Sequence, residues 1–138
     1  MRQLSDIVFN QKPLTMAASS TVAAACCEMR DQRIGSVLVT DNGSLVGIFT
    51  GRDAVGRVLA AGKSASNTTL AEVMTRDPKT MSPDQTAIEA LRMMWTGGYR
   101  HLPVVRAGTI LGVVSRGDFS GMEQDRLEEE RQLWEHLR

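Results

Sequence analysis

The chain repeats itself at an offset of 65 residues. The stretch "GIFTGRD" at 47–53 returns as "GVVSRGD" at 112–118, with a glycine, two apolar residues, a hydroxyl residue and an aspartate in the same places. The match continues over much of the chain, including Pro13 with Pro78, Thr21 with Thr86, Ala25 with Ala90, Val39 with Val104 and Gly43 with Gly108. Upstream the offset becomes 66, where Leu4 aligns with Leu70. This period exceeds that of most solenoid repeats. The sequence therefore predicts two copies of one small unit that form a single pseudo-symmetric body.

Both copies predict the same order of elements. A helix is expected over 21–32, and its counterpart begins with the capping box Thr86-x-x-Glu89 and stops at Gly97-Gly98. Hairpins are expected over 36–50 and 101–115, around the turns "DNG" and "RAG". A second helix is expected over 53–60 and again from about 118. Each copy is thus a βαββα unit, and the fold class is α/β (α+β) with helices layered on sheets.

Composition restricts the class of protein. Hydrophobic residues make up 42% of the 138 and charged residues 23%, as in a globular domain. Lysine plus arginine and aspartate plus glutamate both number 16, which gives no electrostatic reason for nucleic-acid binding. The longest apolar run, 22–27, is too short to cross a membrane, and no export signal is present, so we expect a cytoplasmic protein. No metalloprotease, P-loop or dinucleotide motif occurs, and we expect neither catalysis nor a metal site.

The cysteines and histidines fit structural roles. Cys26 and Cys27 are adjacent and cannot staple distant parts of the chain, and they align with Leu91 and Arg92 of the second copy. One buried and one partly exposed thiol is expected rather than a redox switch. His101 lies where a strand begins, and packing or hydrogen bonding is a better interpretation than a catalytic base. His136, in the charged tail, is expected to be solvated.

Three stretches resemble those of a known family: "IGSVLVTDNGSLVGIFTGRD" (34–53), "YRHLPVVRAGTILGVVSRGD" (99–118) and "EVMTRDPKTMSPDQTAIEALRMM" (72–94). Their order and repetition resemble a tandem pair of cystathionine-β-synthase (CBS) domains. The resemblance assigns 3–61 to the first CBS motif, 62–69 to a linker, 70–121 to the second motif and 122–138 to a C-terminal helical tail. The resemblance covers roughly residues 3 to 121, and we expect a protein similar to stand-alone CBS-pair proteins.

The resemblance implies a sensor rather than an enzyme. Such pairs pack about a pseudo-twofold axis and leave clefts that bind adenosine-containing ligands: AMP, ADP, ATP, S-adenosylmethionine or a dinucleotide. Two pairs usually associate as a homodimer, and ligand binding shifts the dimer arrangement. The alternative is a ligand-free scaffold for dimerisation or for docking an unidentified protein. No catalytic cofactor, nucleic acid or membrane is implied.

The resemblance also implies site residues. For the ribose and phosphate they are Thr50, Arg52, Asp53, Ser115, Arg116 and Asp118. For the base region they are Thr15, Met16, Ala17, Ile34, Gly35, Ser36, Val37, Thr80, Met81, Tyr99, Arg100, His101, Leu102 and Pro103. There, backbone groups are expected to read the adenine edge while apolar side chains sandwich its faces, and Met16 and Met81 are expected to border the clefts.

The chemistry of the repeated phrase is independent of the family. A carboxylate has two acceptor oxygens and can take both hydroxyl donors of a ribose, and a helix start beside it favours a phosphate. Thr50-x-x-Asp53 and Ser115-x-x-Asp118 are equally capping boxes, which need no ligand. Arg52 precedes its aspartate by one residue and Arg116 by two, so the two sites are expected to differ.

The tail at 122–138 favours a helix with a sparse apolar stripe, Leu127, Trp134 and Leu137. One interpretation is a solvated terminal helix. The other, which we favour, is that Leu127 and Trp134 dock on a partner subunit or another protein.

Overall fold

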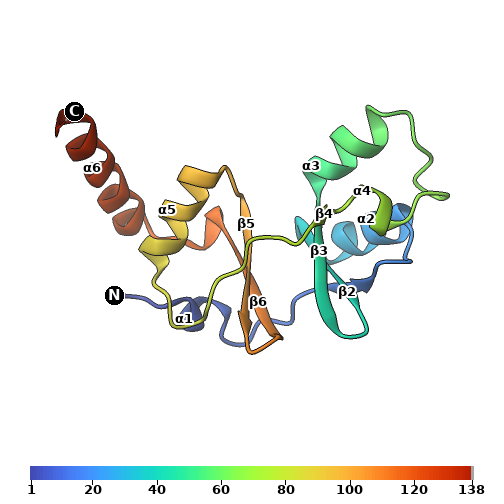
Figure 1. Ribbon diagram of the computed structural model, residues 1–138, viewed down its shortest axis with the longest axis horizontal. Helices are drawn as coiled ribbons and strands as arrows, with labels where there is room; N and C mark the ends of the chain where they lie inside the picture. The colour runs from blue at the N-terminus through green and yellow to red at the C-terminus, as the bar shows by residue number, and fades with distance from the viewer. Residues whose placement is uncertain (138) are drawn as a thin grey trace. The chain divides into compact units, whose positions relative to one another are not determined.

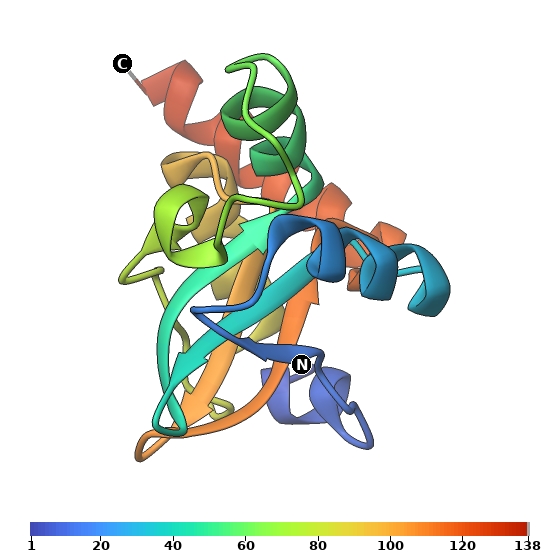
Figure 2. The ribbon, with the colours of Figure 1, turned by 90° about the vertical axis from the view of Figure 1, so that its right-hand side faces the viewer.

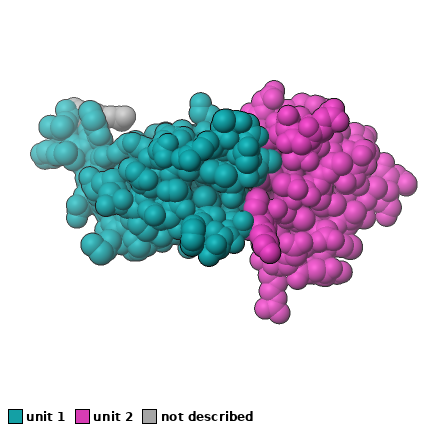
Figure 3. Space-filling view, turned by 90° about the horizontal axis from the view of Figure 1, so that it is seen from below, with its two compact units in different colours: residues 1–11, 79–138 teal, residues 12–78 magenta. Residues whose placement is uncertain are grey.

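The computed structural model describes residues 1–137, which form two compact units. Unit 2 is Lys12–Pro78, and unit 1 joins Met1–Gln11 to the chain from Lys79 onward (Figure 3). The units differ from the sequence repeats, because residues 4–11 of the first repeat lie in the unit that holds the second hairpin. Residues 70–78, their counterparts, lie in the unit that holds the first hairpin.

Unit 2 is a four-stranded sheet with helices packed on it (Figures 1 and 2). The strands are, in sheet order, β1 (Thr15–Ala17), β2 (Ser36–Asp41), β3 (Ser44–Thr50) and β4 (Thr75–Arg76). The helical segments are α2 (Val22–Gln32), α3 (Gly51–Asp53), the π-helical η1 (Ala54–Leu59) and α4 (Leu70–Val73). β1 runs parallel to β2 and the other pairs are antiparallel. The core lies between β2, β3 and these helices, around Phe49, Val37 and Val22.

Unit 1 is built on the second hairpin (Figure 1). Its elements are α1 (Leu4–Val8), α5 (Ala87–Gly97), β5 (His101–Arg106), β6 (Thr109–Ser115), the 3₁₀ turn η2 (Arg116–Asp118) and α6 (Gly121–Leu137). The short first strand of this copy is reduced to a parallel bridge between Met81 and Val104. Leu4, Met94 and Leu102 are fully buried in its core. The predicted mixed α/β class, with a C-terminal helix, is confirmed.

Residues 4–11 pack on the second hairpin at Gly112, and residues 70–78 pack on the first hairpin at Gly47. We call these two stretches the exchanged segments, because each opens one repeat and packs on the hairpin of the other. A Cβ added to Gly112 would lie 2.8 Å from Cβ of Val8, and one added to Gly47 would meet the Met74 side chain and lie 3.0 Å from the Thr75 carbonyl oxygen. Only glycine admits such close approach without displacing a neighbour. Each hairpin is therefore covered by the segment that opens the other repeat.

The predicted helix starts match the structure. The hydroxyl of Thr21 accepts a hydrogen bond from the Ala24 amide at 3.1 Å, and that of Thr86 accepts one from the Glu89 amide at 3.2 Å. These side chains satisfy amides that have no partner within the first helical turn. α5 ends at Gly98, whose φ of 72° is left-handed, as the glycine pair predicted.

The structure shows how the predicted linker and the predicted last helix are packed. Residues 62–69, the expected linker, are packed in unit 2: the Ala65 and Thr68 carbonyls accept hydrogen bonds from α2 amides at 2.9 Å, and Thr68 is buried. The chain passes between the two compact units at 11–12 and 78–79. The helix expected from about 118 is only the turn η2. α6 starts afresh at a second capping box, in which Ser120 and Glu123 exchange hydrogen bonds of 2.9 and 3.2 Å.

The tail interpretation is wrong for Leu127. This residue is 9% exposed and belongs to the core of unit 1, so it is not free to dock elsewhere. Arg92 of α5 and Glu130 of α6 pair at 2.8 Å and further tie α6 to α5. Trp134 is 66% exposed, and for this residue the docking interpretation stays a prediction.

Candidate functional site

In unit 2 the end of β3 meets the start of β2. Thr50 lies opposite Ser36 in the antiparallel pair, and the Gly51 amide donates to the Gly35 carbonyl at 3.4 Å. β1 lies on the other side of β2, where Thr15 is the partner of Leu38. The three segments predicted to form the first site, 15–17, 34–37 and 50–53, are therefore brought together by one sheet.

Unit 1 repeats this arrangement. His101 lies opposite Ser115, where β5 starts and β6 ends. The Met81 amide donates to the Pro103 carbonyl at 2.9 Å, and the Met81 carbonyl accepts from the Val105 amide at 2.9 Å. The predicted residues of the second site thus gather on three neighbouring segments, 80–81, 99–103 and 115–118.

Each aspartate of the repeated phrase caps its own helical turn. Oδ2 of Asp53 accepts from the Thr50 amide at 2.9 Å and from the Thr50 hydroxyl at 3.3 Å. Oδ2 of Asp118 accepts from the Ser115 amide at 2.7 Å and from its hydroxyl at 3.3 Å. The capping interpretation is confirmed in both copies. In each copy the capping hydrogen bonds use only Oδ2 of the aspartate and do not involve Oδ1.

The two copies differ at that second oxygen. Oδ1 of Asp53 lies 3.5 Å from Nε of Arg57, one helical turn further on. Nη1 of Arg57 also donates to the carbonyls of Met74 at 3.0 Å and Val73 at 3.3 Å. Within residues 1–137, no side chain or amide donates to Oδ1 of Asp118. Sequence reasoning missed Arg57, although an arginine four residues after an aspartate in a helix is a signal for an ion pair.

Several apolar side chains predicted to sandwich the base belong to the cores of the two units. Val37, Met81 and Leu102 are at most 2% exposed and lie within the cores of their own units, and Met16 packs against the core of unit 2. Buried β-strand side chains cannot also present a face to a ligand. Ile34 and Tyr99, which precede the two hairpins, are 37% and 38% exposed. Ala17 of β1 is exposed as well, so Ala17, Ile34 and Tyr99 are the apolar residues predicted for the base whose side chains are exposed.

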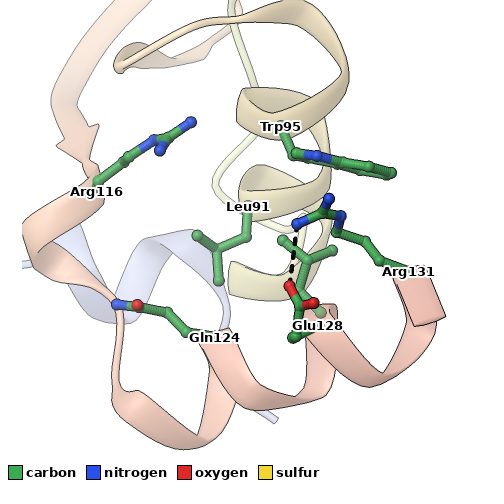
Figure 4. Close-up of a pocket in the computed structure, with 7 residues that line it drawn as sticks. Leu91, Trp95, Arg116, Gln124, Glu128 and Arg131 are labelled. Carbon is green, nitrogen blue, oxygen red and sulfur yellow. Dashed lines mark hydrogen bonds and ion pairs between the residues drawn. The ribbon is translucent and has the colours of Figure 1, made fainter.

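The two predicted phosphate arginines occupy different surroundings. Arg52 is exposed near the start of α3. Arg116 is also exposed, and it lines a pocket of about 230 Å³ in unit 1 between η2, α5 and α6 (Figure 4). Leu91 and Trp95 enter this pocket from α5, and Arg131 from α6, with its guanidinium 4.5 Å from the Trp95 ring. Arg116 therefore faces the helices of its own unit.

The predicted site residue His101 has a lowered pKa. Burial lowers its pKa below the ordinary value of 6.5, and the charge of Arg100 lowers it further, while the charge of Asp118 opposes both. The neutral imidazole, which prevails at neutral pH, can both donate and accept a hydrogen bond. His101 thus adds a neutral polar group beside the Asp118 carboxylate.

The cysteines have the surroundings that the alignment predicted. Cys26 is partly buried against the core of unit 2, and burial raises the pKa of its thiol, which makes it a poor nucleophile. Cys27 is exposed. Among residues 1–137 no cluster of three histidine, cysteine or acidic side chains is arranged to hold a metal ion. None of the helices in that range is both long and apolar enough to span a bilayer.

The fold and the capping aspartate present in each repeat define a class of protein: paired α/β repeats whose hairpins each end at a capped helical turn. The CBS domain family matches residues 4–60 and 70–121, and the chain belongs to this family. CBS-domain pairs are regulatory modules. The predicted family is therefore confirmed.

Relatives and solved structures agree on the family. The chain is 41% identical over 104 residues to CBS domain-containing protein CBSCBSPB2 of Arabidopsis thaliana, covering 75% of this chain and 19% of that protein. It thus spans about a fifth of that relative's length. A putative signal-transduction protein with CBS domains from Burkholderia ambifaria shares 29% identity and a TM-score of 0.80, over 84% of this chain and 89% of that one. A CBS domain protein from Pyrobaculum aerophilum complexed with AMP has a TM-score of 0.81 at 20% identity, over 92% and 98%.

Proposed function

We propose that this CBS pair is a sensor that binds an adenosine-containing ligand, such as AMP, ADP, ATP or S-adenosylmethionine, and changes its dimer arrangement in response. The ribose hydroxyls would donate to the aspartate that closes one of the two repeated phrases. The phosphate would lie at the start of the following helical turn, within reach of the Thr50 or Ser115 hydroxyl. The signal would pass to another protein, and no catalytic step is involved.

The observation that carries the proposal is that the capping hydrogen bonds of Asp118 use only Oδ2 of its carboxylate. The carboxylate lies beside two polar groups, the Ser115 hydroxyl at 3.3 Å and the imidazole of His101 opposite Ser115. A capping carboxylate needs only one oxygen, and the second is suited to a pair of hydroxyl donors. The Pyrobaculum aerophilum protein, at 20% identity, adds that this fold can accommodate AMP.

Calorimetry tests the proposal. The full chain is titrated with AMP, ADP, ATP, NAD and S-adenosylmethionine, and thermal unfolding is recorded with each. A micromolar ligand corresponds to about −8 kcal/mol, and a charge-assisted hydrogen bond from ribose supplies about 1.5–3 kcal/mol of it. Asp118→Asn should therefore weaken binding about tenfold or more. Absence of heat and of thermal shift with every ligand at millimolar concentration contradicts the sensor proposal.

A ligand-free interaction scaffold is the second candidate. It is favoured by the outer part of α6, where Leu133, Trp134 and Leu137 are 58–68% exposed. Exposed apolar side chains so close together are typical of a contact surface. Sedimentation of the full chain and of a Trp134→Ala variant separates the candidates. A scaffold is expected to sediment as an oligomer that dissociates in the Trp134→Ala variant. Its oligomeric state should not change when adenosine ligands are added.

A further inference from the structure

We propose that only one of the two repeats binds the ligand. Asp118 in unit 1 binds it, while Arg57 blocks the equivalent carboxylate, that of Asp53, in unit 2. This inference rests on the proposed function and specifies which site performs it. In the resting protein Arg57 takes the place that a ribose would fill at Asp53. The expected stoichiometry is one ligand per chain.

The closure of Asp53 follows from its contacts. Both carboxylate oxygens are engaged, Oδ2 by Thr50 at 2.9 Å and Oδ1 by the Arg57 guanidinium at 3.5 Å. The carboxylate itself is buried, with 11% of the side chain exposed. A pair of hydroxyls can reach it only by displacing the guanidinium, and a buried carboxylate that loses a cationic partner is destabilised. Ligand binding at Asp53 therefore competes with an existing ion pair.

Arg57 is held in place by more than Asp53. Its two hydrogen bonds to the carbonyls of Val73 and Met74 satisfy backbone acceptors at the end of α4. Met74 in turn packs against Gly47 at the start of the same repeated phrase. Moving Arg57 would leave these carbonyls without their donor, so the guanidinium is fixed on both sides.

Among residues 1–137, no cation contacts the Asp118 carboxylate as Arg57 contacts that of Asp53. The residue 65 positions after Arg57 is Met122, which is 84% exposed. Arg2 lies close, but its guanidinium pairs with Glu123 at 2.7 Å and donates to the backbone carbonyl of Asp118 rather than to the carboxylate. His101, the other titratable neighbour, has a lowered pKa because of burial, so it is neutral at pH 7.5. Within the described residues, a ligand can therefore bind Oδ1 of Asp118 without breaking an ion pair.

The test counts AMP sites on the full chain at pH 7.5 by calorimetry, for the wild type and three variants. We expect one site in the wild type, a loss of about tenfold or more in affinity in Asp118→Asn, and unchanged binding in Asp53→Asn. In Arg57→Gln a second site should appear and the stoichiometry should rise to two. Adding Asp53→Asn to Arg57→Gln should remove that second site again.

Arg76→Gln is the matched control for Arg57→Gln. Arg76 lies in the same unit and also donates to a backbone carbonyl of α4, that of Ala71 at 3.0 Å, but it forms neither a hydrogen bond nor an ion pair with Asp53. Its replacement should leave one site. The amide NMR spectrum of the wild-type protein gives a second measurement. AMP should shift the amide signals of residues 115–118 and leave those of residues 50–53 unchanged.

The outcomes separate the inference from the function on which it rests. Two equal sites in the wild type, or AMP shifts at 50–53, overturn the closure by Arg57 while the sensor function stands. A stoichiometry that stays at one in a folded Arg57→Gln protein also overturns it. No AMP binding by the wild type or by Arg57→Gln, with no binding of the other adenosine ligands, overturns both.

Discussion

Replacing Gly112 with alanine should loosen residues 4–11 from β6 in unit 1. The added Cβ would lie 2.6 Å from Oε1 of Gln11 and 2.8 Å from Cβ of Val8. Neither neighbour can yield freely, because Val8 is buried and the Gln11 amide group makes two 3.0 Å hydrogen bonds with the Val113 backbone. Forcing a methyl group into packed surroundings costs about 1–3 kcal/mol, and we expect the free energy of unfolding to fall by that amount.

Unfolding in guanidinium chloride, followed by tryptophan fluorescence, measures this loss. Both tryptophans, Trp95 and Trp134, lie in unit 1, so the signal reports the unit that carries the change. Gly117→Ala is the matched control, since nothing lies within 4 Å of a Cβ at that position. It should change the free energy of unfolding by less than about 0.5 kcal/mol.

A double variant tests the geometry directly. Gln11→Ala removes the atom closest to the new methyl group, so its effect and that of Gly112→Ala should add to more than the effect of the double variant. Strict additivity, or a Gly112→Ala protein as stable as the wild type, would refute the packing of residues 4–11 on β6.

Other substitutions test the remaining structural conclusions. Leu127→Ala should lower the free energy of unfolding by about 2–3 kcal/mol, the lower end of the range for a buried leucine, because Leu127 lies at the edge of the core. Trp134→Ala should change it by less than about 0.5 kcal/mol in dilute solution, since the ring is exposed. The lowered pKa of His101 means that the unfolded chain binds its proton first as pH falls, so stability conferred by the neutral form is present above about pH 6.5 and is lost as pH falls through the folded pKa. Urea titrations at pH 8 and pH 5 should show a smaller loss in His101→Gln than in the wild type.

Local patterns predicted the secondary structure of both repeats because its causes are local. The capping box at Thr86, the glycine stop at Gly98 and the alternation in the hairpins each act within a few residues. The exchange of residues 4–11 and 70–78 could not be predicted in this way. Both segments have the same apolar pattern, with Leu4 matching Leu70, so either one fits either hairpin. Chain connectivity and packing decide between them, and neither appears in a comparison of one repeat with the other.

The same argument explains why the candidate site was only partly predicted. The segments around Asp53 and Asp118 were predicted because they are repeated. A comparison of the two copies finds only the residues that both copies share. The difference between the sites was expected from the shifted arginines, yet Arg52 and Arg116 make no ion pair within residues 1–137. The cation that separates the copies is Arg57, which has Met122 as its counterpart and lies outside the repeated phrase. Under the proposed closure by Arg57, a duplicated phrase keeps its residues in both copies, while a single neighbouring side chain decides which copy is open to a ligand.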